Sequence, residues 1–352
     1  MSLSPATQFL LKDALEEAPI ESSAPCRVDC GGTWDLPAFS LPFHHVNPTT
    51  VNFAIALRTR VRLLPFKTGW TKVSSRDFLV EEYPSAEVPF DSPLGLVFAI
   101  ATFFNVTGVH IHIESESPPR SALGGSGALG VAVVNAFSKA LLKAGAKPIS
   151  RQQLVEIAYS IENGVSVSLT GKQDQAAAAF GGVNQWFWKG DGGFERRELI
   201  QPERVGEVEP HLLVAYCGQT HDSADVNSTW VSSFLAGRNR SLWFEMNTVT
   251  NEFGRAVENT DWATAGALLR AETELRQALT PEVLIPATQA LFNCATEHGC
   301  GARFTGAGGG GCLWAMGGEN EIFALRQAWT TMLARVEGAK ILPSRIDVEG
   351  AV

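Results

Sequence analysis

The sequence predicts an α+β protein with two domains. Its 352 residues are enough for two domains and too many for one ordinary hydrophobic core. Residues typical of paired strands fill 46–64, whereas apolar residues recur at helical spacing over 129–140 and again over 154–161. Strands and helices are therefore expected within one half of the chain, and no repeat of fixed period is visible.

The boundary between the halves is predicted within 189–207, a stretch rich in glycine and charged residues. We therefore expect one domain at 1–200 and a second at 201–352. The second domain should open with a strand at 211–217, continue with long helices, and close with a strand near 346–348.

Composition argues against several classes of protein. The net charge is -9 and no run of Lys or Arg occurs, so nucleic acid is not an expected partner. The six cysteines form no CxxC pair, which disfavours a zinc ribbon or a thioredoxin-type centre and fits a reducing compartment. Residues 1–18 have neither a basic start nor a long apolar core, so no signal peptide is expected and the predicted location is cytoplasmic.

The segment 92–113 needs a check as a membrane span, because it contains no Lys, Arg, Asp or Glu. Asn105 and Gly108 interrupt it, and its end alternates between apolar residues and two histidines. That alternation is typical of a strand. We expect a buried helix followed by a strand, and no membrane partner.

The most informative segment is 109–137, which predicts a strand, a loop rich in glycine and serine, and a helix. Free N–H groups at the start of a helix favour an anion, and Ser126 could face a phosphate or a magnesium ion. Two other interpretations are a flexible turn and a dinucleotide site, since Gly125–Gly130 matches GxGxxG. Residues 115–122 separate that match from its strand, and no GxxxxGK[ST] motif occurs.

Three further segments place cations, acids and glycines close together. They are 24–39 (APCRVDCGGTWDLPAF), 171–182 (GKQDQAAAAFGG) and 301–313 (GARFTGAGGGGCL). In this order they resemble the motifs of the GHMP kinases, over most of the chain. The details are similar to the branch of fucokinases and D-glycero-D-manno-heptose 7-phosphate kinases, and 215–227 is a looser match to the same branch.

The resemblance implies a GHMP-kinase-like fold with ATP and sugar in the cleft between the domains. It also implies roles for individual residues. Asp174 resembles the carboxylate that receives the proton of the acceptor hydroxyl or orients that hydroxyl, and Arg27 resembles the cation near the transferred phosphate. Apart from the resemblance, Lys172 would help to keep Asp174 ionised if the two side chains lie close together in space. Ser126 and Glu162 resemble the pair that binds Mg²⁺. The residues expected to bind ATP phosphates are Leu123, Gly124, Gly125, Ser126, Gly127 and Ala128. The residues expected near the substrate are Gly31, Gly32, Asp35, His221, Gly306, Ala307, Gly308 and Gly309.

Each role has a structural alternative. Asp174 could cap a helix, Glu162 could be a solvated helix end, and Arg27 could form an ion pair with Asp29 or Asp35. His221 could be a hydrogen-bonded structural residue.

The chain also departs from the family pattern. Ala122 stands where Gly is usual, Gly125 where Ser is usual, and Gly127 where Ala or Ser is common. The first motif is one residue short between Arg27 and Asp35, which makes Asp29 a second candidate for the sugar contact.

The predicted activity is transfer of the γ-phosphoryl group of MgATP to a sugar hydroxyl, with the anomeric hydroxyl as the first choice. The acceptor is expected to be an L-fucose-like hexose or a heptose 7-phosphate, and the expected cofactors are ATP and Mg²⁺. A monomer and a homodimer both stay open. Two other functions are possible: a catalytically silent sugar and nucleotide sensor on the same fold, or an NAD-dependent dehydrogenase built on Gly125–Gly130.

Overall fold

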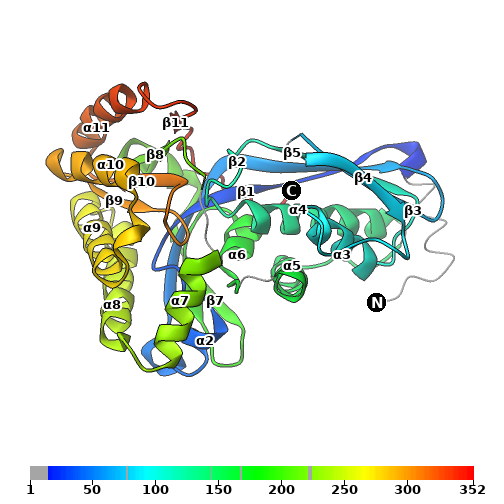
Figure 1. The fold of residues 1–352 in the computed structure, drawn as a ribbon, viewed down its shortest axis with the longest axis horizontal. Coiled ribbons are helices and arrows are strands. Elements are labelled where there is room, and N and C mark those ends of the chain that lie inside the picture. The colour runs from blue at the N-terminus through cyan, green and yellow to red at the C-terminus, as the bar shows by residue number, and fades with distance from the viewer. Residues whose placement is uncertain (1–14, 77, 144, 167–168, 221–223) are drawn as a thin grey trace.

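The structure is a computed structural model that describes residues 15–76, 78–143, 145–166, 169–220 and 224–352. It contains two sheets, which lie in the two lobes seen in Figure 1. The seven-stranded sheet belongs to the first part of the chain and ends at Ile200. The four-stranded sheet begins at Leu212. The α+β class expected from the sequence is confirmed.

The larger sheet is organised around one long strand, β2 (Thr49–Pro65). Its first half pairs with β6 and its second half with β5, while β1 pairs along the opposite edge. The strand order is β4-β3-β5-β2-β6-β7, and the pair β3 and β5 is parallel. The other strands are β1 (Ile20–Cys30), β3 (Trp70–Ser75), β4 (Phe78–Pro84), β5 (Val109–Ser115), β6 (Val183–Trp188) and β7 (Phe194–Ile200).

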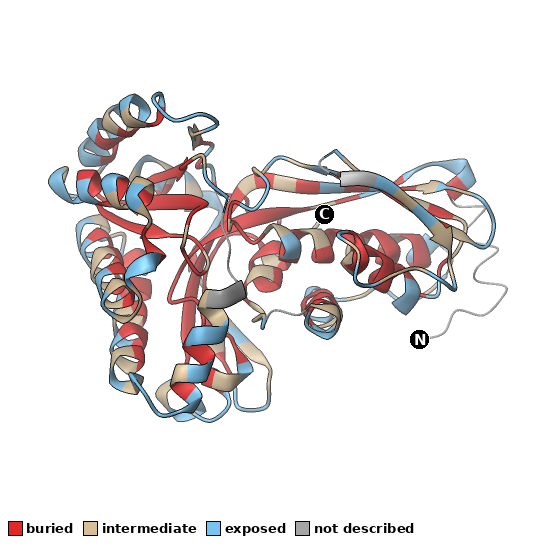
Figure 2. Cartoon of the chain, viewed as in Figure 1, coloured by how far each residue is buried: buried red, intermediate tan, exposed pale blue. Residues whose placement is uncertain are grey.

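The helices of this part of the chain pack on the sheet or on other helices. They are α3 (Gly95–Phe103), α4 (Gly125–Lys143), α5 (Arg151–Val165) and α6 (Gln173–Phe180), with the short α2 (Pro37–Ser40) and η1 (His44–Val46) after β1. Helix α4 lies against β1 and β2 and is buried over much of its surface (Figure 2). It is long and apolar enough to cross a membrane, but 67% of that window is buried inside the protein, as in a core helix.

The smaller sheet has the order β11-β8-β10-β9 and is antiparallel throughout. Its strands are β8 (Leu212–Tyr216), β9 (Gly301–Phe304), β10 (Cys312–Met316) and β11 (Lys340–Leu342). The helices of this part of the chain are α7 (Ala224–Leu235), α8 (Arg240–Glu258), α9 (Trp262–Leu279), α10 (Pro286–Glu297) and α11 (Glu319–Leu333). Helices α9, α10 and α11 contact the smaller sheet, whereas α8 packs on α9 and on β2 and β7 of the larger sheet. Short 3-10 turns are η2 (Pro202–Glu207), η3 (Glu209–His211) and η4 (Pro281–Val283).

The expected helix followed by a strand over 92–113 is confirmed by α3 and β5. The expected final strand near 346–348 is wrong, since the last strand is β11 and Ile346 forms only a single bridge with Ile55. The chain instead turns back to the larger sheet, where Val352 and Ser23 exchange two backbone hydrogen bonds of 3.0 and 2.8 Å. The last residues of the predicted second domain therefore lie on the first sheet.

Candidate active site

The site is built around the first turn of α4. The N–H of Ala128 donates to the carbonyl of Gly124, so the helix ladder begins there and the N–H groups of Gly125, Ser126 and Gly127 precede it. Such N–H groups have no partner within their own helix and carry the positive end of the helix dipole. A Cβ added at Gly125 would meet only Ser117 Oγ, at 3.8 Å. The start of α4 can therefore receive an anion.

Asp174 lies directly beside this turn, in the first turn of α6. A Cβ at Gly127 would lie 2.6 Å from the Cβ of Asp174, and one at Gly124 would lie 3.1 Å from its Cγ. Glycine at both positions lets α4 and α6 come this close. The side chain of Asp174 remains 25% exposed, so it can reach a bound ligand.

Arg27, on β1, holds the carboxylate of Asp174. Its Nε donates to Asp174 Oδ1 at 2.8 Å, and a terminal nitrogen lies 2.7 Å from the same oxygen. The other terminal nitrogen donates to the carbonyl of Ala122 at 2.7 Å and lies 3.2 Å from Asp29. Burial alone would lower the pKa of Arg27, but Asp174 and Asp29 outweigh it and the pKa is raised.

Glu162 and Ser126 meet on the other side of the α4 turn. Glu162 accepts hydrogen bonds from the Ser126 hydroxyl and from Gln175 Nε2, the latter at 2.5 Å. Burial raises the pKa of Glu162 to about 7 against these two hydrogen bonds, and the nearby charge of Asp174 adds to the rise. Glu162 is 8% exposed, so it is not a solvated helix end.

The glycine-rich loop between β9 and β10 (305–311) closes the site from the smaller sheet. Cys312 N donates to Ser121 O at 3.1 Å, and a Cβ at Gly306 would lie 3.4 Å from Ala122 and 4.0 Å from Arg27. Gly306 and the adjoining, buried Ala307 are thus at the junction of the two lobes. Gly308 and Gly309 pack instead on the backbone of η4.

Asp35 lies next to the site but its carboxylate is occupied. Its two oxygens accept the N–H groups of Thr33 at 3.1 Å and of Gln173 at 3.0 Å, so it caps α6. Burial raises its pKa to about 6. It also lines a cavity of about 170 Å³ together with Tyr159 and Lys172.

Gly31 is required by packing between the lobes, and Gly32 by packing within the larger lobe. A Cβ at Gly31 would lie 2.4 Å from Thr250 of α8, and Gly31 has a φ of +74°. A Cβ at Gly32 would lie 2.7 Å from Asp29 Oδ2. The structure thus places both glycines against protein atoms, and their contact with substrate stays a prediction.

The expected partnership of Lys172 with Asp174 is wrong. The ammonium of Lys172 donates to both oxygens of Glu156, at 2.9 and 2.7 Å, and to the carbonyl of Gly192 at 2.6 Å. Although Lys172 is two residues from Asp174, it lies just before α6 and its side chain extends toward α5 and the β6–β7 turn. Arg27 supplies the positive charge instead. His221 lies outside the described residues.

Sequence reasoning named Asp29 as a possible ion-pair partner of Arg27 or sugar contact, but it missed the buried charges behind Asp29. Asp29 is fully buried and accepts from Gly306 N at 3.0 Å and from Arg303 at 3.0 Å. Arg303 in turn pairs with Glu272, and Glu272 with Arg276. Arg303 could have been found, because it stands inside the glycine motif 301–313. Glu272 and Arg276 lie in an ordinary helical pattern, which does not indicate a site.

The dinucleotide interpretation fails on geometry, because all three of its glycines lie in the first turns of α4 and β5 ends at Ser115.

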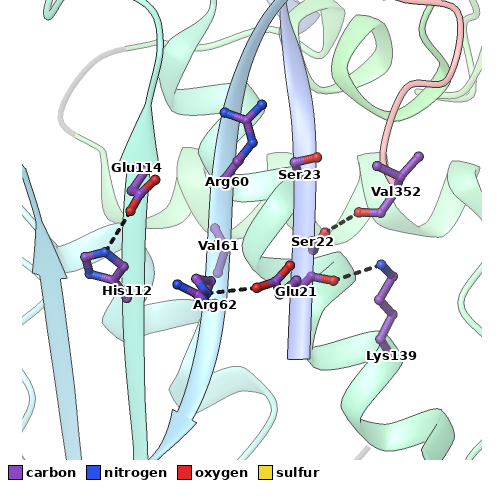
Figure 3. Close-up of a pocket in the computed structure, with 10 residues that line it drawn as sticks. All are labelled: Glu21, Ser22, Ser23, Arg60, Val61, Arg62, His112, Glu114, Lys139 and Val352. Atoms are coloured by element: carbon purple, nitrogen blue, oxygen red, sulfur yellow. Dashed lines mark hydrogen bonds and ion pairs between the residues drawn. The ribbon is translucent and has the colours of Figure 1, made fainter. Parts of the chain in front are cut away.

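A larger cavity, of about 470 Å³, lies away from these residues (Figure 3). It is lined by β1, β2, β5, Lys139 of α4 and Val352. Its charged groups face one another: Arg62 lies 2.9 Å from Glu21, and Lys139 donates to the carbonyl of Glu21 at 2.9 Å. With its charges paired in this way and none of the residues above in its lining, it is not part of the candidate site.

Comparison with known proteins decides the family. The model described as the GHMP kinases N terminal domain matches residues 95–182, and the GHMP kinases C terminal model matches 255–335. The chain belongs to the GHMP kinases. The two matched regions include α4, α6 and the glycine-rich loop, which are the elements that meet at the site. The resemblance inferred from the motifs is confirmed.

Among curated relatives of this GHMP kinase is a D-glycero-alpha-D-manno-heptose 7-phosphate kinase of Campylobacter jejuni. It is 23% identical over 58% of this chain and 60% of its own length. A bifunctional fucokinase/GDP-fucose pyrophosphorylase of Arabidopsis thaliana is 26% identical over 82% of this chain and 29% of that protein. A mevalonate kinase of Pyrococcus abyssi is 22% identical over 84% of this chain and 89% of its own. The chain therefore spans 60% of the length of this heptose 7-phosphate kinase and 29% of the length of this fucokinase.

A solved structure shows the same fold. The D-glycero-D-manno-heptose 1-phosphate kinase from Bacteroides thetaiotaomicron superposes with a TM-score of 0.72 and 18% identity, over 95% of this chain and 98% of that one. The two-domain arrangement expected from the motifs is thus that of a known GHMP kinase structure.

Proposed function

We propose that this GHMP kinase transfers the γ-phosphoryl group of MgATP to a hydroxyl group of a sugar. The observation that carries the proposal is the position of Asp174. Its partly exposed carboxylate lies beside the anion-receiving turn of α4 and is held by Arg27. Phosphoryl transfer needs a phosphate cradle, a cation and a group that orients the nucleophile, and these three features adjoin one another here.

In this proposal Asp174 accepts the proton of the acceptor hydroxyl or orients that hydroxyl. Its ion pair with Arg27 fixes the position of the carboxylate beside the start of α4. The N–H groups of Gly125, Ser126 and Gly127 bind the nucleotide phosphates. Arg27 lies between Asp174 and Gly306, where it can also approach the transferred phosphoryl group.

Ser126 and Glu162 fit a magnesium ion. Both offer oxygen atoms, and Mg²⁺ in kinases takes few protein ligands and completes its shell with phosphates and water. Gln175 Oε1 is buried without a hydrogen-bond partner beside Glu162, and burial raises the pKa of Glu162 to about 7. A cation bound there would favour the charged form of Glu162. When bound, the ion would neutralise charge on the β- and γ-phosphates.

The cavity beside Asp35 supports an unphosphorylated acceptor. Lys172 and Lys189, which line it, are both paired, with Glu156 at 2.7 Å and with Glu195 at 2.6 Å. These two lysines therefore offer no surplus positive charge to a second phosphate on the sugar. We propose an L-fucose-like free hexose as the acceptor, with a heptose 7-phosphate as the other candidate. The anomeric hydroxyl is proposed from the resemblance to fucose and heptose kinases.

The test is ADP release by the pure protein with MgATP over a panel of free sugars and sugar phosphates. Asp174→Asn should lower kcat by roughly 10² to 10⁴, the usual contribution of general acid–base catalysis. Asp191→Asn, an exposed change in the β6–β7 turn, is the matched control and should leave kcat unchanged. Binding of ATP and a sugar without turnover would instead identify a sensor. Absence of ATP binding would refute the proposed function.

A further inference from the structure

Six charged side chains of alternating sign connect the candidate site to the core of the smaller lobe. In order they are Asp174, Arg27, Asp29, Arg303, Glu272 and Arg276. The first three come from the larger sheet and its helices, and the last three from β9 and α9. The series therefore crosses the junction of the two lobes, and its charges sum to zero.

Arg303 is the centre of this series. Its guanidinium binds Asp29 Oδ2 at 3.0 Å and the carbonyl of Asp29 at 3.1 Å, while its Nε binds Glu272 Oε2 at 2.6 Å. Arg303, Asp29 and Glu272 are all fully buried. Burial alone would lower the pKa of Arg303, but Glu272 and Asp29 outweigh it and the pKa is raised. A buried, fully paired guanidinium of this kind holds its partners in one geometry.

The far end of the series returns to the segment that directly follows β1. Glu272 binds Arg276 at 2.9 Å, and Arg276 donates to the Thr33 hydroxyl at 3.1 Å and to the carbonyl of Gly32. Residues 29–33 are thus fixed from the smaller lobe at two points, by Arg303 and by Arg276. The same residues lead directly from Arg27 to Asp35.

We propose that Arg303 is a positioning residue, which fixes Asp29 and through it both Arg27 and the Gly306 amide at the junction of the lobes. This inference rests on the proposed function for its catalytic consequence. Asp29 Oδ1 binds Arg27 and Gly306 N, while Oδ2 binds Arg303, so one carboxylate joins three parts of the site.

Arg303 also controls how much positive charge Arg27 can offer a phosphate. Arg27 faces two carboxylates, Asp174 and Asp29. If Asp29 had no second cation beside it, the two negative charges would exceed the single positive charge of Arg27. Arg303 neutralises Asp29 from the opposite side. Without Arg303, the full charge of Asp29 would act on Arg27, and Asp29 would be a buried carboxylate with one cation fewer.

Hydrogen exchange followed by mass spectrometry tests the positioning without requiring activity. Arg303→Met should speed exchange of peptides that contain Gly306 and residues 29–33 by at least tenfold, whereas Arg303→Lys should give an intermediate effect. Arg58→Met is the matched control, because it breaks another buried ion pair, with Asp347, that ties the chain end to β2. It should leave exchange at the site unchanged.

Steady-state kinetics tests the consequence. Arg303→Met should lower kcat at least tenfold and change the KM for ATP less than threefold, with partial rescue by lysine and wild-type kcat in Arg58→Met. Unchanged exchange at the site, or faster exchange with unchanged kcat, would overturn the inference. If Arg303→Met does not fold, Arg303→Lys decides it by the same two measurements. If the wild-type protein phosphorylates no sugar, the proposed function fails, and the exchange data alone decide whether Arg303 holds the site together.

Discussion

Glu162→Gln should make the metal-free protein more stable, and this gain in stability should grow with pH. The same substitution should lower the activity measured with MgATP. Glutamine fits the site, since its carbonyl can accept from Gln175 Nε2 and its amide can donate to the Ser126 hydroxyl. No hydrogen bond is lost. The substitution removes only a carboxylate whose charged form is disfavoured by burial.

The magnitude follows from linkage. Burial raises the folded-state pKa of Glu162 to about 7 from 4.5 in the unfolded chain. Between these values the folded state binds more protons, so stability falls as pH rises and the penalty is complete above pH 7. It amounts to about 1 kcal/mol at pH 5 and about 3 kcal/mol at pH 8. Glutamine escapes this penalty, so the variant should gain about 2 kcal/mol over wild type between the two pH values.

Urea unfolding at pH 5 and pH 8, in the presence of a chelator, measures this difference. Glu203→Gln, an exposed change, controls for general loss of charge and should show no pH-dependent gain. MgATP should stabilise wild type but not Glu162→Gln, and kcat of the variant should fall at least tenfold, because the proposed magnesium ligand is lost. A stability difference that is the same at both pH values would refute the assignment of a buried, charge-disfavoured carboxylate.

Two further predictions concern the neighbours of Asp174. Lys172→Met should lower the free energy of unfolding by roughly 1 kcal/mol through loss of the bond to Glu156. Because Lys172 does not hold Asp174, kcat should stay within threefold of wild type, and a hundredfold loss would restore its catalytic assignment. Gly127→Ala should cost roughly 1 to 3 kcal/mol in unfolding experiments and lower kcat at least tenfold, since its Cβ would collide with Asp174. Gly130→Ala, with its nearest contact at 3.5 Å, is the control and should leave kcat unchanged.

The parts of the site that were predicted are those encoded by local sequence. A strand, a glycine-rich loop and an apolar helical pattern are each contained within a few residues, so the start of α4 and its Ser126 followed from 109–137 alone. Asp174 followed from a short motif in the same way. The structure places the two side by side, because Gly127 lies directly against Asp174, and their roles stay predictions.

The parts that were not predicted depend on contacts between distant segments. The partner of Asp174 was expected two residues away, at Lys172, but is Arg27, 147 positions earlier in the chain. Likewise Glu272 meets Arg303 only because α9 packs on β9. Helical periodicity places Glu272 on the buried face but does not say which cation it meets, so a buried carboxylate in an ordinary helix gives no functional signal.

The departures from the family pattern acquire a physical reason once these contacts are known. An alanine at 127 would collide with Asp174, so glycine there permits the close approach of α6 that puts the carboxylate at the helix start. Ala122 has a φ of +61°, a conformation that costs an L-residue about 1 to 2 kcal/mol. Its methyl group packs on Gly306 and Gly311, and its carbonyl accepts a hydrogen bond from Arg27. The loop has thus lost hydroxyl groups but gained direct contact with the glycine-rich loop. In this chain, binding of phosphates should accordingly depend more on backbone N–H groups and Arg27 than on serine hydroxyls.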